Sequence, residues 1–397
     1  MPMYFFILGR QPEFSVVEAW QVAQSLGLKF TNIALTKDFW IVEAKSLDLL
    51  KLQQTLAGMV KLGEVLAGVN NKEQLITAAV KKIIKPAKRL LFGFSWYGQE
   101  PRLMKQLGLE LKREYKTDGR VRFVVSREKV LSSVTVQKNH LLPPSGWEII
   151  FLPVEDKVQI GRTITVQPFA DYSERDYERP SRELREGMLP PKLARTMVNL
   201  AGGSGLKSLL DPFCGSGTVL QEAALLGVPQ LVGSDNQEAA ITRTKQNWQW
   251  LVRRRGVKAQ LQLFTVGLEQ LSSKINNRKF ASVVSEPFLG PPLSGKETSK
   301  QLAAIYLSLT QDYTRWVGYL ANLLASNGRL VMVWPVLVEG SNFNFLPLIE
   351  ALDQAGLKFI EAVPPFLPSS WLTERGTLLY YRRGQKIARE IVVLEKK

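Results

Sequence analysis

Residues 211–218 are Asp211-Pro212-Phe213-Cys214-Gly215-Ser216-Gly217-Thr218, and they separate two segments of different character. The short apolar run before them, 206–210, is typical of a buried strand, and the segment after them, 219–226, is typical of a helix. The two glycines let the backbone turn sharply and approach a ligand closely. Turns that bind phosphate present a helix N-terminus to an anion. Here an acid ends the strand, which suits a ligand with positive charge.

The segment 230–235 completes a nucleotide-binding unit. It is a second apolar run, and it ends on Asp235, 18 residues after Gly217. That is close to the spacing of a carboxylate that holds ribose hydroxyls. A ligand with a ribose and positive charge is S-adenosylmethionine, which we expect as the cofactor. A glycine turn that merely connects a strand to a helix is the alternative interpretation.

Composition restricts the class of protein. The chain has 397 residues, enough for two or three domains, and 52 Lys and Arg against 36 Asp and Glu give a net charge of +16. This excess favours a polyanionic partner, with an acidic membrane surface as the alternative. One cysteine and one histidine exclude a disulfide framework and the usual Cys/His zinc site. We therefore expect no metal.

No segment of the chain is typical of export or membrane insertion. The apolar run at 3–8 is short for a signal peptide and has no basic residues before it. No window approaches the roughly 20 apolar residues of a membrane span. We expect a cytoplasmic protein without a membrane partner.

The N-terminal half is predicted to form two α+β modules. The first, 1–70, has strands at 3–8, 39–43 and 61–67, and a helix capped by Ser15. The second, 71–160, has helices at 72–84 and 101–115, an apolar stretch at 89–94, and strands at 120–125, 130–136 and 148–152. It is basic, with ten Lys and Arg against four Asp and Glu between 102 and 138. A linker or extended arm, 161–186, follows.

Residues 187–397 alternate between strand and helix. Seven strands are expected, near 206–211, 230–235, 261–265, 280–285, 329–334, 358–363 and 377–383. This alternation predicts an α/β domain with a doubly wound sheet. In such a sheet the turns after the first and fourth strands lie side by side at the carboxyl edge.

The turn after the fourth strand contains an acid, a proline and an aromatic ring, Glu286-Pro287-Phe288. Glu286 can accept hydrogen bonds from an exocyclic amine of a base, and Phe288 can stack on the ring of a base that has left its stack. We expect these three residues to form the catalytic site.

Several motifs in the chain resemble one family. They are Arg175-Asp176-Tyr177-Glu178-Arg179-Pro180, Gly187-Met188-Leu189-Pro190-Pro191-Lys192, the 211–218 turn and Glu374-Arg375-Gly376-Thr377-Leu378. With looser matches at 56–64 and 120–139, the chain resembles the THUMP-containing tRNA guanosine N2-methyltransferases, which act on guanosine 10 of tRNA. The resemblance covers most of the chain.

The resemblance implies a class I methyltransferase domain after ferredoxin-like and THUMP-like modules, S-adenosylmethionine as methyl donor, and tRNA as substrate. It implies transfer to the N2 amine of a guanosine. Six residues of the turns and Pro190 would hold the cofactor: Asp211, Phe213, Gly215, Gly217, Asp235 and Asn236. The basic residues expected to contact RNA are Lys112, Arg113, Lys116, Arg120, Arg122 and Lys138.

The chain departs from the family in two places. It has Glu-Pro-Phe-Leu at 286–289, where the family has Asp-Pro-Pro-Tyr, and the third strand ends without an Asp for the adenine amine. Two alternatives therefore stay open: an adenine N6-methyltransferase acting on RNA or DNA, and a non-catalytic RNA-binding homologue. The sequence leaves open the modified nucleotide, the number of methyl groups and the need for an activating subunit.

Overall fold

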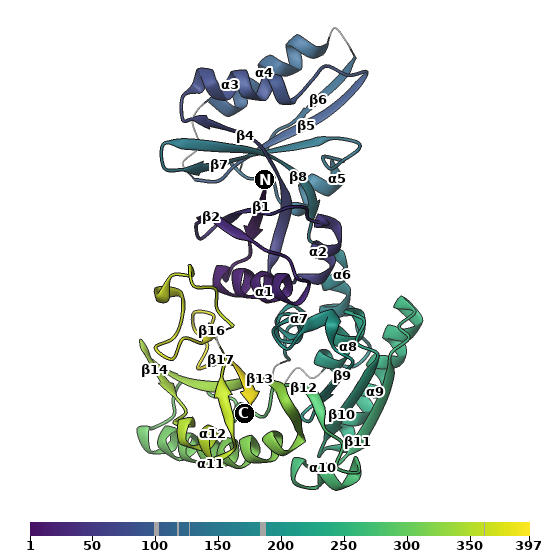
Figure 1. Cartoon of the computed structure of the whole chain (residues 1–397), viewed down its shortest axis with the longest axis vertical. Helices are drawn as coiled ribbons and strands as arrows, with labels where there is room; N and C mark the ends of the chain where they lie inside the picture. Colours follow the sequence, from purple (N-terminus) through teal and green to yellow (C-terminus); the bar gives the residue numbers. More distant parts are fainter. Residues whose placement is uncertain (99–102, 117–118, 127, 183–187, 361) are drawn as a thin grey trace. The chain divides into compact units, whose positions relative to one another are not determined.

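The chain folds into two compact units, which the computed structural model describes over residues 1–98, 103–116, 119–126, 128–182, 188–360 and 362–397 (Figure 1). Unit 1 comprises Met1–Val16 and Gly27–Ala170, and unit 2 comprises Val17–Leu26 and Asp171–Lys397. The predicted domain boundary at 186/187 lies outside the described residues. None of the described helices is long and apolar enough to cross a membrane.

Unit 1 is built around one eight-stranded sheet of order β2-β3-β1-β4-β8-β7-β5-β6. Its strands are β1 (Met3–Leu8), β2 (Thr31–Leu35), β3 (Phe39–Glu43), β4 (Met59–Asn70), β5 (Arg89–Trp96), β6 (Arg120–Val124), β7 (Trp147–Val154) and β8 (Lys157–Val166). The helices are α1 (Pro12–Ser25), α2 (Leu49–Thr55), α3 (Glu73–Ile83), α4 (Leu103–Tyr115) and α5 (Ser133–Lys138). Antiparallel pairing of β4 with β8 joins the strands of the two predicted modules into this sheet.

A buried ion pair joins β4 to β7 across β8, the strand that lies between them in the sheet. Lys61 donates to Glu148, which also accepts hydrogen bonds from Ser95 (2.6 Å) and Thr163 (2.6 Å). Both charged side chains are almost completely buried. Charges so placed need each other and their hydrogen bonds, so this cluster restrains how the strands pair.

Two sequence predictions for unit 1 are wrong. Ser15 does not cap a helix, because α1 begins at Pro12; its hydroxyl instead accepts from the Gly9 amide (3.1 Å) and donates to the Gly58 carbonyl (2.8 Å). Residues 130–136 do not form a strand. Ser132 accepts a hydrogen bond from the Thr135 amide (3.1 Å) and starts α5, so a side-chain cap outweighs the strand preference of the valines there.

Unit 2 contains a nine-stranded sheet whose main path is β11-β10-β9-β12-β13-β17-β15. The strands are β9 (Ser208–Asp211), β10 (Gln230–Asp235), β11 (Gln260–Thr265), β12 (Phe280–Ser285), β13 (Leu324–Glu339), β14 (Asn342–Phe345), β15 (Leu357–Phe359), β16 (Leu378–Tyr380) and β17 (Ile387–Lys396). The first five strands of the path are parallel, and β17 is antiparallel to β13. The predicted α/β sheet is therefore present.

Helices cover both faces of this sheet (Figure 1). They are α7 (Pro191–Leu200), α8 (Thr218–Leu225), α9 (Glu238–Arg255), α10 (Leu268–Lys274), α11 (Ser299–Leu323) and α12 (Ile349–Gln354). The last three pack on one face, in a core that includes Phe280, Tyr313 and Trp334, all fully buried. The buried residues of α11 follow a helical spacing along one face, Leu309, Tyr313, Val317 and Leu320, and this face is the core side of the helix.

Two predictions for unit 2 need correction. The expected seventh strand at 377–383 is only the short β16, and the strand that pairs with β13 is β17, which begins at Ile387. Residues 169–178 do not form an extended arm. They fold into α6 (Phe169–Ser173) and a π-helical turn (Glu174–Glu178), and Arg175 of that turn is buried.

Candidate active site

The glycine turn lies between β9 and α8, as predicted. Gly215 has φ +52° and Gly217 has φ +82°, a region that favours glycine. A Cβ on Gly217 would meet the Thr244 side chain at 2.8 Å, whereas nothing lies within 4 Å of a Cβ on Gly215. Gly217 is therefore required for packing of the turn, and Gly215 leaves open space beside the backbone that a ligand can occupy.

Asp211 ends β9 in a fully buried position. Its Oδ1 accepts hydrogen bonds from the Ser285 hydroxyl (2.6 Å) and the Phe213 amide (3.3 Å). Burial raises the pKa of the Asp211 carboxyl to about 7, against the lowering effect of those hydrogen bonds. Ser285 ends β12, so this contact ties the carboxyl ends of the first and fourth strands together.

Asp235 ends β10 and also holds the glycine turn. Its Oδ2 accepts from the Gly215 amide (3.1 Å), and its Oδ1 accepts from the Gln237 amide (3.0 Å). The carboxylate is half-buried and lines the same cavity as Asp211. A ribose hydroxyl can donate to the remaining lone pairs of this carboxylate.

The turn after β12 carries Glu286, Pro287 and Phe288. Glu286 accepts a hydrogen bond from Arg389 of β17, with 2.6 Å between Oε1 and Nε. The buried Tyr313 of α11 donates its hydroxyl to the Phe288 carbonyl (3.2 Å), which fixes the backbone of the turn. The Phe288 ring itself is 55% exposed, so its face is available for stacking.

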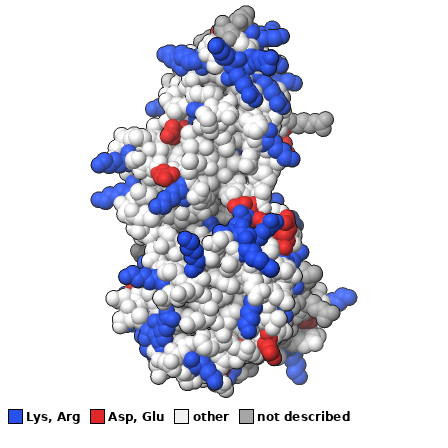
Figure 2. All heavy atoms as spheres, turned by 90° about the vertical axis from the view of Figure 1, so that its right-hand side faces the viewer, with Lys and Arg blue, Asp and Glu red and all other residues white. Residues whose placement is uncertain are grey.

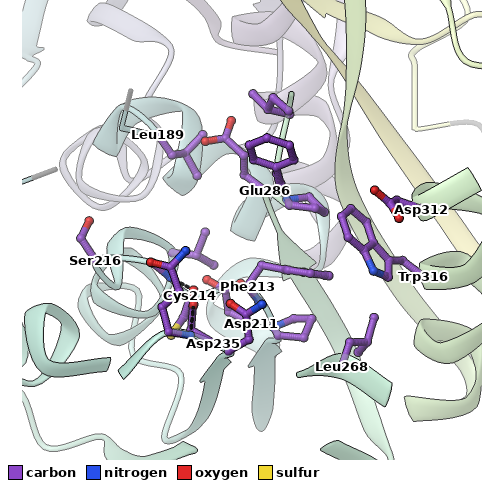
Figure 3. A pocket seen from close by; sticks show the side chains of 18 of the residues that line it. Leu189, Asp211, Phe213, Cys214, Ser216, Asp235, Leu268, Glu286, Asp312 and Trp316 are labelled. Atoms are coloured by element: carbon purple, nitrogen blue, oxygen red, sulfur yellow. Dashed lines mark hydrogen bonds between the residues drawn. The ribbon is translucent and has the colours of Figure 1, made fainter. Parts of the chain in front are cut away.

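These residues surround a cavity of about 810 Å³ at the carboxyl edge of the sheet (Figure 3). In the view of Figure 3, Asp211 and Asp235 lie beside the glycine turn, and Glu286 lies away from them across the cavity. All three predicted catalytic residues line the cavity, and so do most of the predicted cofactor residues, namely Asp211, Phe213, Gly215, Asp235 and Asn236. The volume is sufficient for a small ligand.

Two predicted cofactor residues do not line the cavity. Gly217 is the N-cap of α8, and Pro190 is the N-cap of α7. The residues next to Pro190, Met188 and Leu189, line it instead. The segment expected beside the cofactor therefore does line the cavity, but through Met188 and Leu189 rather than through Pro190.

Sequence reasoning missed two prominent cavity residues. The Trp316 ring lies 4.8 Å from the Phe213 ring, and Arg389 holds Glu286. Neither carries a local signal, since Trp316 belongs to the apolar pattern of α11 and Arg389 to a strand that was not predicted. At the end of β11, where the expected Asp is missing, Gly267, Leu268 and Glu269 line the cavity.

Cys214 lies in the turn but is inert. It is buried, and burial together with the Asp211 and Asp235 carboxylates raises the pKa of its thiol well above the usual value. Cys214 is therefore a packing residue of the turn rather than a nucleophile. Among the described residues, no group of three or more His, Cys, Asp or Glu side chains is placed to hold a metal ion.

A buried cluster supports the turn from behind. Arg179 donates to the Thr218 hydroxyl (2.7 Å), and Asn247 donates to the Ser181 and Ser216 carbonyls (both 2.9 Å). Thr218 is the first residue of α8. Residues of the segment 172–182 therefore fix the N-terminus of the helix that follows the glycine turn.

The predicted RNA-binding residues lie on unit 1, five of them exposed and Lys112 half-buried. Lys112, Arg113 and Lys116 are at the end of α4, and Arg120 and Arg122 are on β6 at the edge of the sheet. Arg122 donates to Asn139 (2.8 Å), next to Lys138. Figure 2 shows Lys and Arg side chains gathered over the end of unit 1 that carries α3, α4, β5 and β6.

Comparisons with known proteins agree with this geometry. Residues 179–334 match the family model "RMKL-like, methyltransferase domain". A tRNA (guanine(10)-N2)-dimethyltransferase of Methanothermobacter thermautotrophicus is 27% identical over 251 residues, 63% of this chain and 68% of the relative. The enzyme with the same name from Pyrococcus abyssi is 35% identical, over 41% of this chain and 42% of the relative.

Solved structures of similar fold cover the whole chain. TrmN from Thermus thermophilus has a TM-score of 0.56 at 15% identity and covers 100% of both chains. SMU.472, described as a putative methyltransferase complexed with SAH, has a TM-score of 0.50 at 11% identity and covers 98% of both chains. At these identities the likeness is one of fold. Both the glycine turn and the Glu286 turn lie within the segment 179–334 that matches the RMKL-like methyltransferase domain model.

Proposed function

We propose that this chain is an S-adenosylmethionine-dependent tRNA methyltransferase that acts on the exocyclic N2 amine of a guanosine. The observation that carries the proposal is the single cavity shared by two turns. One turn offers Asp211 and Asp235, and the other offers Glu286 and an exposed aromatic ring. The names of the curated relatives supply the substrate, tRNA, and the position on the base, N2 of guanine.

The residues beside the glycine turn fit S-adenosylmethionine. Asp211 offers a carboxylate to the ammonium group, Asp235 offers acceptors to the ribose, and Gly215 leaves room for the ligand beside the backbone. Val266, Gly267 and Leu268 line the same cavity, and their backbone groups and the Leu268 side chain would take the adenine ring. The bound cofactor supplies a methyl group made electrophilic by its sulfonium sulfur.

The second turn handles the base. Phe288 stacks on the extruded guanine, which has to leave its stack to enter the cavity. Glu286 accepts hydrogen bonds from the N1–H and the N2 amine of the guanine. These two hydrogen bonds fix the position of the base and orient the lone pair of the N2 nitrogen toward the cofactor. The proton left on nitrogen after transfer passes to Glu286 or to solvent.

Unit 1 presents the RNA in this proposal. Its first strands and helices follow the order β1-α1-β2-β3-α2-β4, which supports a ferredoxin-like module at 1–70, and we assign a THUMP-like module to 71–160. A connecting segment that contains α6 and the π-helical turn, and the methyltransferase domain 187–397, complete the organisation. The exposed cations of α4, β6 and α5 would contact phosphates of the tRNA, in the cytoplasm.

The test is methyl transfer from labelled S-adenosylmethionine to unmodified tRNA, followed by nucleoside analysis. Wild-type protein should form N2-methylguanosine or N2,N2-dimethylguanosine. Glu286→Ala should lower the rate by about 100-fold or more, because the acceptor that orients the amine is gone. Glu350→Ala is the matched control, since Glu350 is an exposed acid on α12 outside the cavity.

Each other outcome has a clear meaning. N6-methyladenosine as product would transfer the assignment to adenine and contradict the guanine proposal. Measurable cofactor binding without transfer to any tRNA would contradict the proposed activity and favour a binding protein. A Glu286→Ala variant as active as Glu350→Ala would refute the role of the second turn.

A further inference from the structure

Arg389 is a half-buried cation at the cavity that the proposed reaction does not yet use. It lies in the interior of β17, in register with Pro335 of β13 and Tyr380 of β16. Its side chain is 12% exposed, and that of Glu286 is 13% exposed. Removing two charges from water to this extent is costly unless each has a partner of opposite charge. The Arg389–Glu286 ion pair is therefore a fixed part of the cavity wall.

The pair leaves hydrogen-bond donors unused. In the described part of the chain, Arg389 hydrogen bonds to Glu286 through Nε. A guanidinium carries five N–H donors in a flat fork, so the two terminal nitrogens remain for a ligand. Arg389 lines the cavity together with Glu286, Pro287 and Phe288. The ligand of its terminal nitrogens is therefore the same molecule that the 286–288 turn binds, the target base.

An acceptor and a donor thus lie side by side at the base site. The Glu286 carboxylate takes hydrogen bonds from N–H groups, and the neighbouring guanidinium gives them to an oxygen or ring nitrogen. The edge of guanine has the complementary pattern, with N–H donors at N1 and N2 next to the acceptor O6. Pairing of arginine with O6 of guanine is a common way in which proteins recognise this base.

We propose that Arg389 is a specificity-determining residue, which donates to O6 of the target guanine while it holds Glu286 against N1–H and the N2 amine. This inference rests on the proposed function, because it assumes that the base in the cavity is guanine. The longer side chain at 286 is consistent with it. Glu286 reaches Arg389 across β13, which lies between β12 and β17 in the sheet.

The experiment changes O6 alone. The target guanosine, located first by mapping the product, is replaced by 6-thioguanosine in otherwise identical unmodified tRNA. Sulfur is a weak acceptor, while the N1–H and the 2-amine are kept. Wild-type protein should lose about 10- to 100-fold in kcat/KM on the sulfur-containing tRNA, the range expected when one arginine–guanine contact is lost.

Arg389→Gln should lower kcat/KM for the normal tRNA by a similar factor and bring the ratio between the two tRNAs close to one. A role limited to folding would lower both rates and keep the ratio. Arg389→Lys keeps the positive charge beside Glu286 and serves where Arg389→Gln does not fold; it should also lose most of the discrimination. Arg382→Gln is the matched control, an exposed arginine outside the cavity that pairs with Tyr380.

Failure of this inference is distinct from failure of the proposed function. Transfer to guanosine with an unchanged preference for oxygen over sulfur in both Arg389 variants would overturn the inference and leave the proposed function intact. Faster transfer by Arg389→Gln would also overturn it, since Arg389 would then restrain Glu286 rather than read the base. Absence of transfer by wild-type protein to any tRNA would refute both.

Discussion

Asp211 has two roles that favour different protonation states of its side chain. Packing against Ser285 and the strand ends requires a buried side chain, which favours the neutral acid. Holding the ammonium group of the proposed cofactor requires the carboxylate. Because burial sets the pKa of Asp211 at about 7, both forms are populated near neutral pH before the cofactor binds.

Cofactor affinity should therefore depend on pH. A positive ligand favours ionised Asp211, so binding lowers the pKa of this group, and below the unliganded value of about 7 the protein must release a proton to bind. We expect the affinity for S-adenosylmethionine to be level above pH 7 to 8 and to fall by up to about tenfold per pH unit below it. Isothermal titration calorimetry between pH 5.5 and 8.5, in two buffers of different ionisation enthalpy, measures both the affinity and the proton released.

Asp211→Asn is the control for this prediction. The variant should bind the cofactor more weakly at pH 8 and show little pH dependence. Its fold should become more stable relative to wild type as the pH rises from 4 to 7, because in this range the unfolded wild-type chain ionises Asp211 while the folded protein still keeps it protonated, and the variant has no such group. A wild-type affinity that does not change between pH 6 and 8 would contradict the assigned pKa or the contact between Asp211 and the ligand.

At the level of elements, α8 is fixed by the segment that precedes α7 and by α7 itself. Glu222 of α8 accepts from Arg175 (2.6 Å) and Arg195 (2.7 Å), and all three side chains are buried. Arg175 and Arg195 also lie against the Tyr172 ring. One carboxylate thus satisfies two guanidinium groups and ties the π-helical turn, α7 and α8 together.

Glu222→Gln should destabilise unit 2 strongly. The amide keeps one acceptor but turns a donor toward a buried arginine, and breaking a buried ion pair typically costs about 3 to 5 kcal/mol. We expect a loss in Tm on the order of 10 °C and weaker cofactor binding, because α8 begins at the glycine turn. Thermal unfolding followed by circular dichroism measures the first effect, with the exposed Glu350→Gln as the matched substitution. A Tm within 2 °C of wild type would show that the cluster is not needed for stability.

The same elements show what local sequence can predict. Asp211, Asp235 and Glu286 were found because each follows an apolar strand directly, so strand and functional residue form one short signal. β17 was missed because its sequence mixes Arg389 and Glu390 into an apolar run, and tertiary contacts bury both of these charges. Trp316 and Arg389 reach the cavity from α11 and β17, and no pattern within those elements indicates where their side chains meet.

For the whole molecule, the net charge of +16 is the property that relates most directly to RNA. The cations are not all equivalent. Lys81 is paired with Glu110 and Glu114, whereas Lys116 and Arg120 are exposed at the end of α4 and the start of the edge strand β6. Unpaired exposed cations can release counterions from a phosphate backbone, and paired ones contribute less. The sequence predicted this surface from composition, without placing its residues in space.

Replacing two of these cations should lower both the affinity for tRNA and its dependence on salt. We expect the double substitution Lys116→Gln and Arg120→Gln to reduce the slope of log K against log salt by about two, near 0.9 for each lost phosphate contact. The matched control is Lys258→Gln with Lys274→Gln. These exposed lysines precede β11 and end α10, at the amino-terminal edge of the sheet of unit 2, opposite the cavity. Filter binding between 50 and 300 mM KCl gives both slopes; equal slopes for the two double variants would mean that net charge, rather than this surface of unit 1, binds the tRNA.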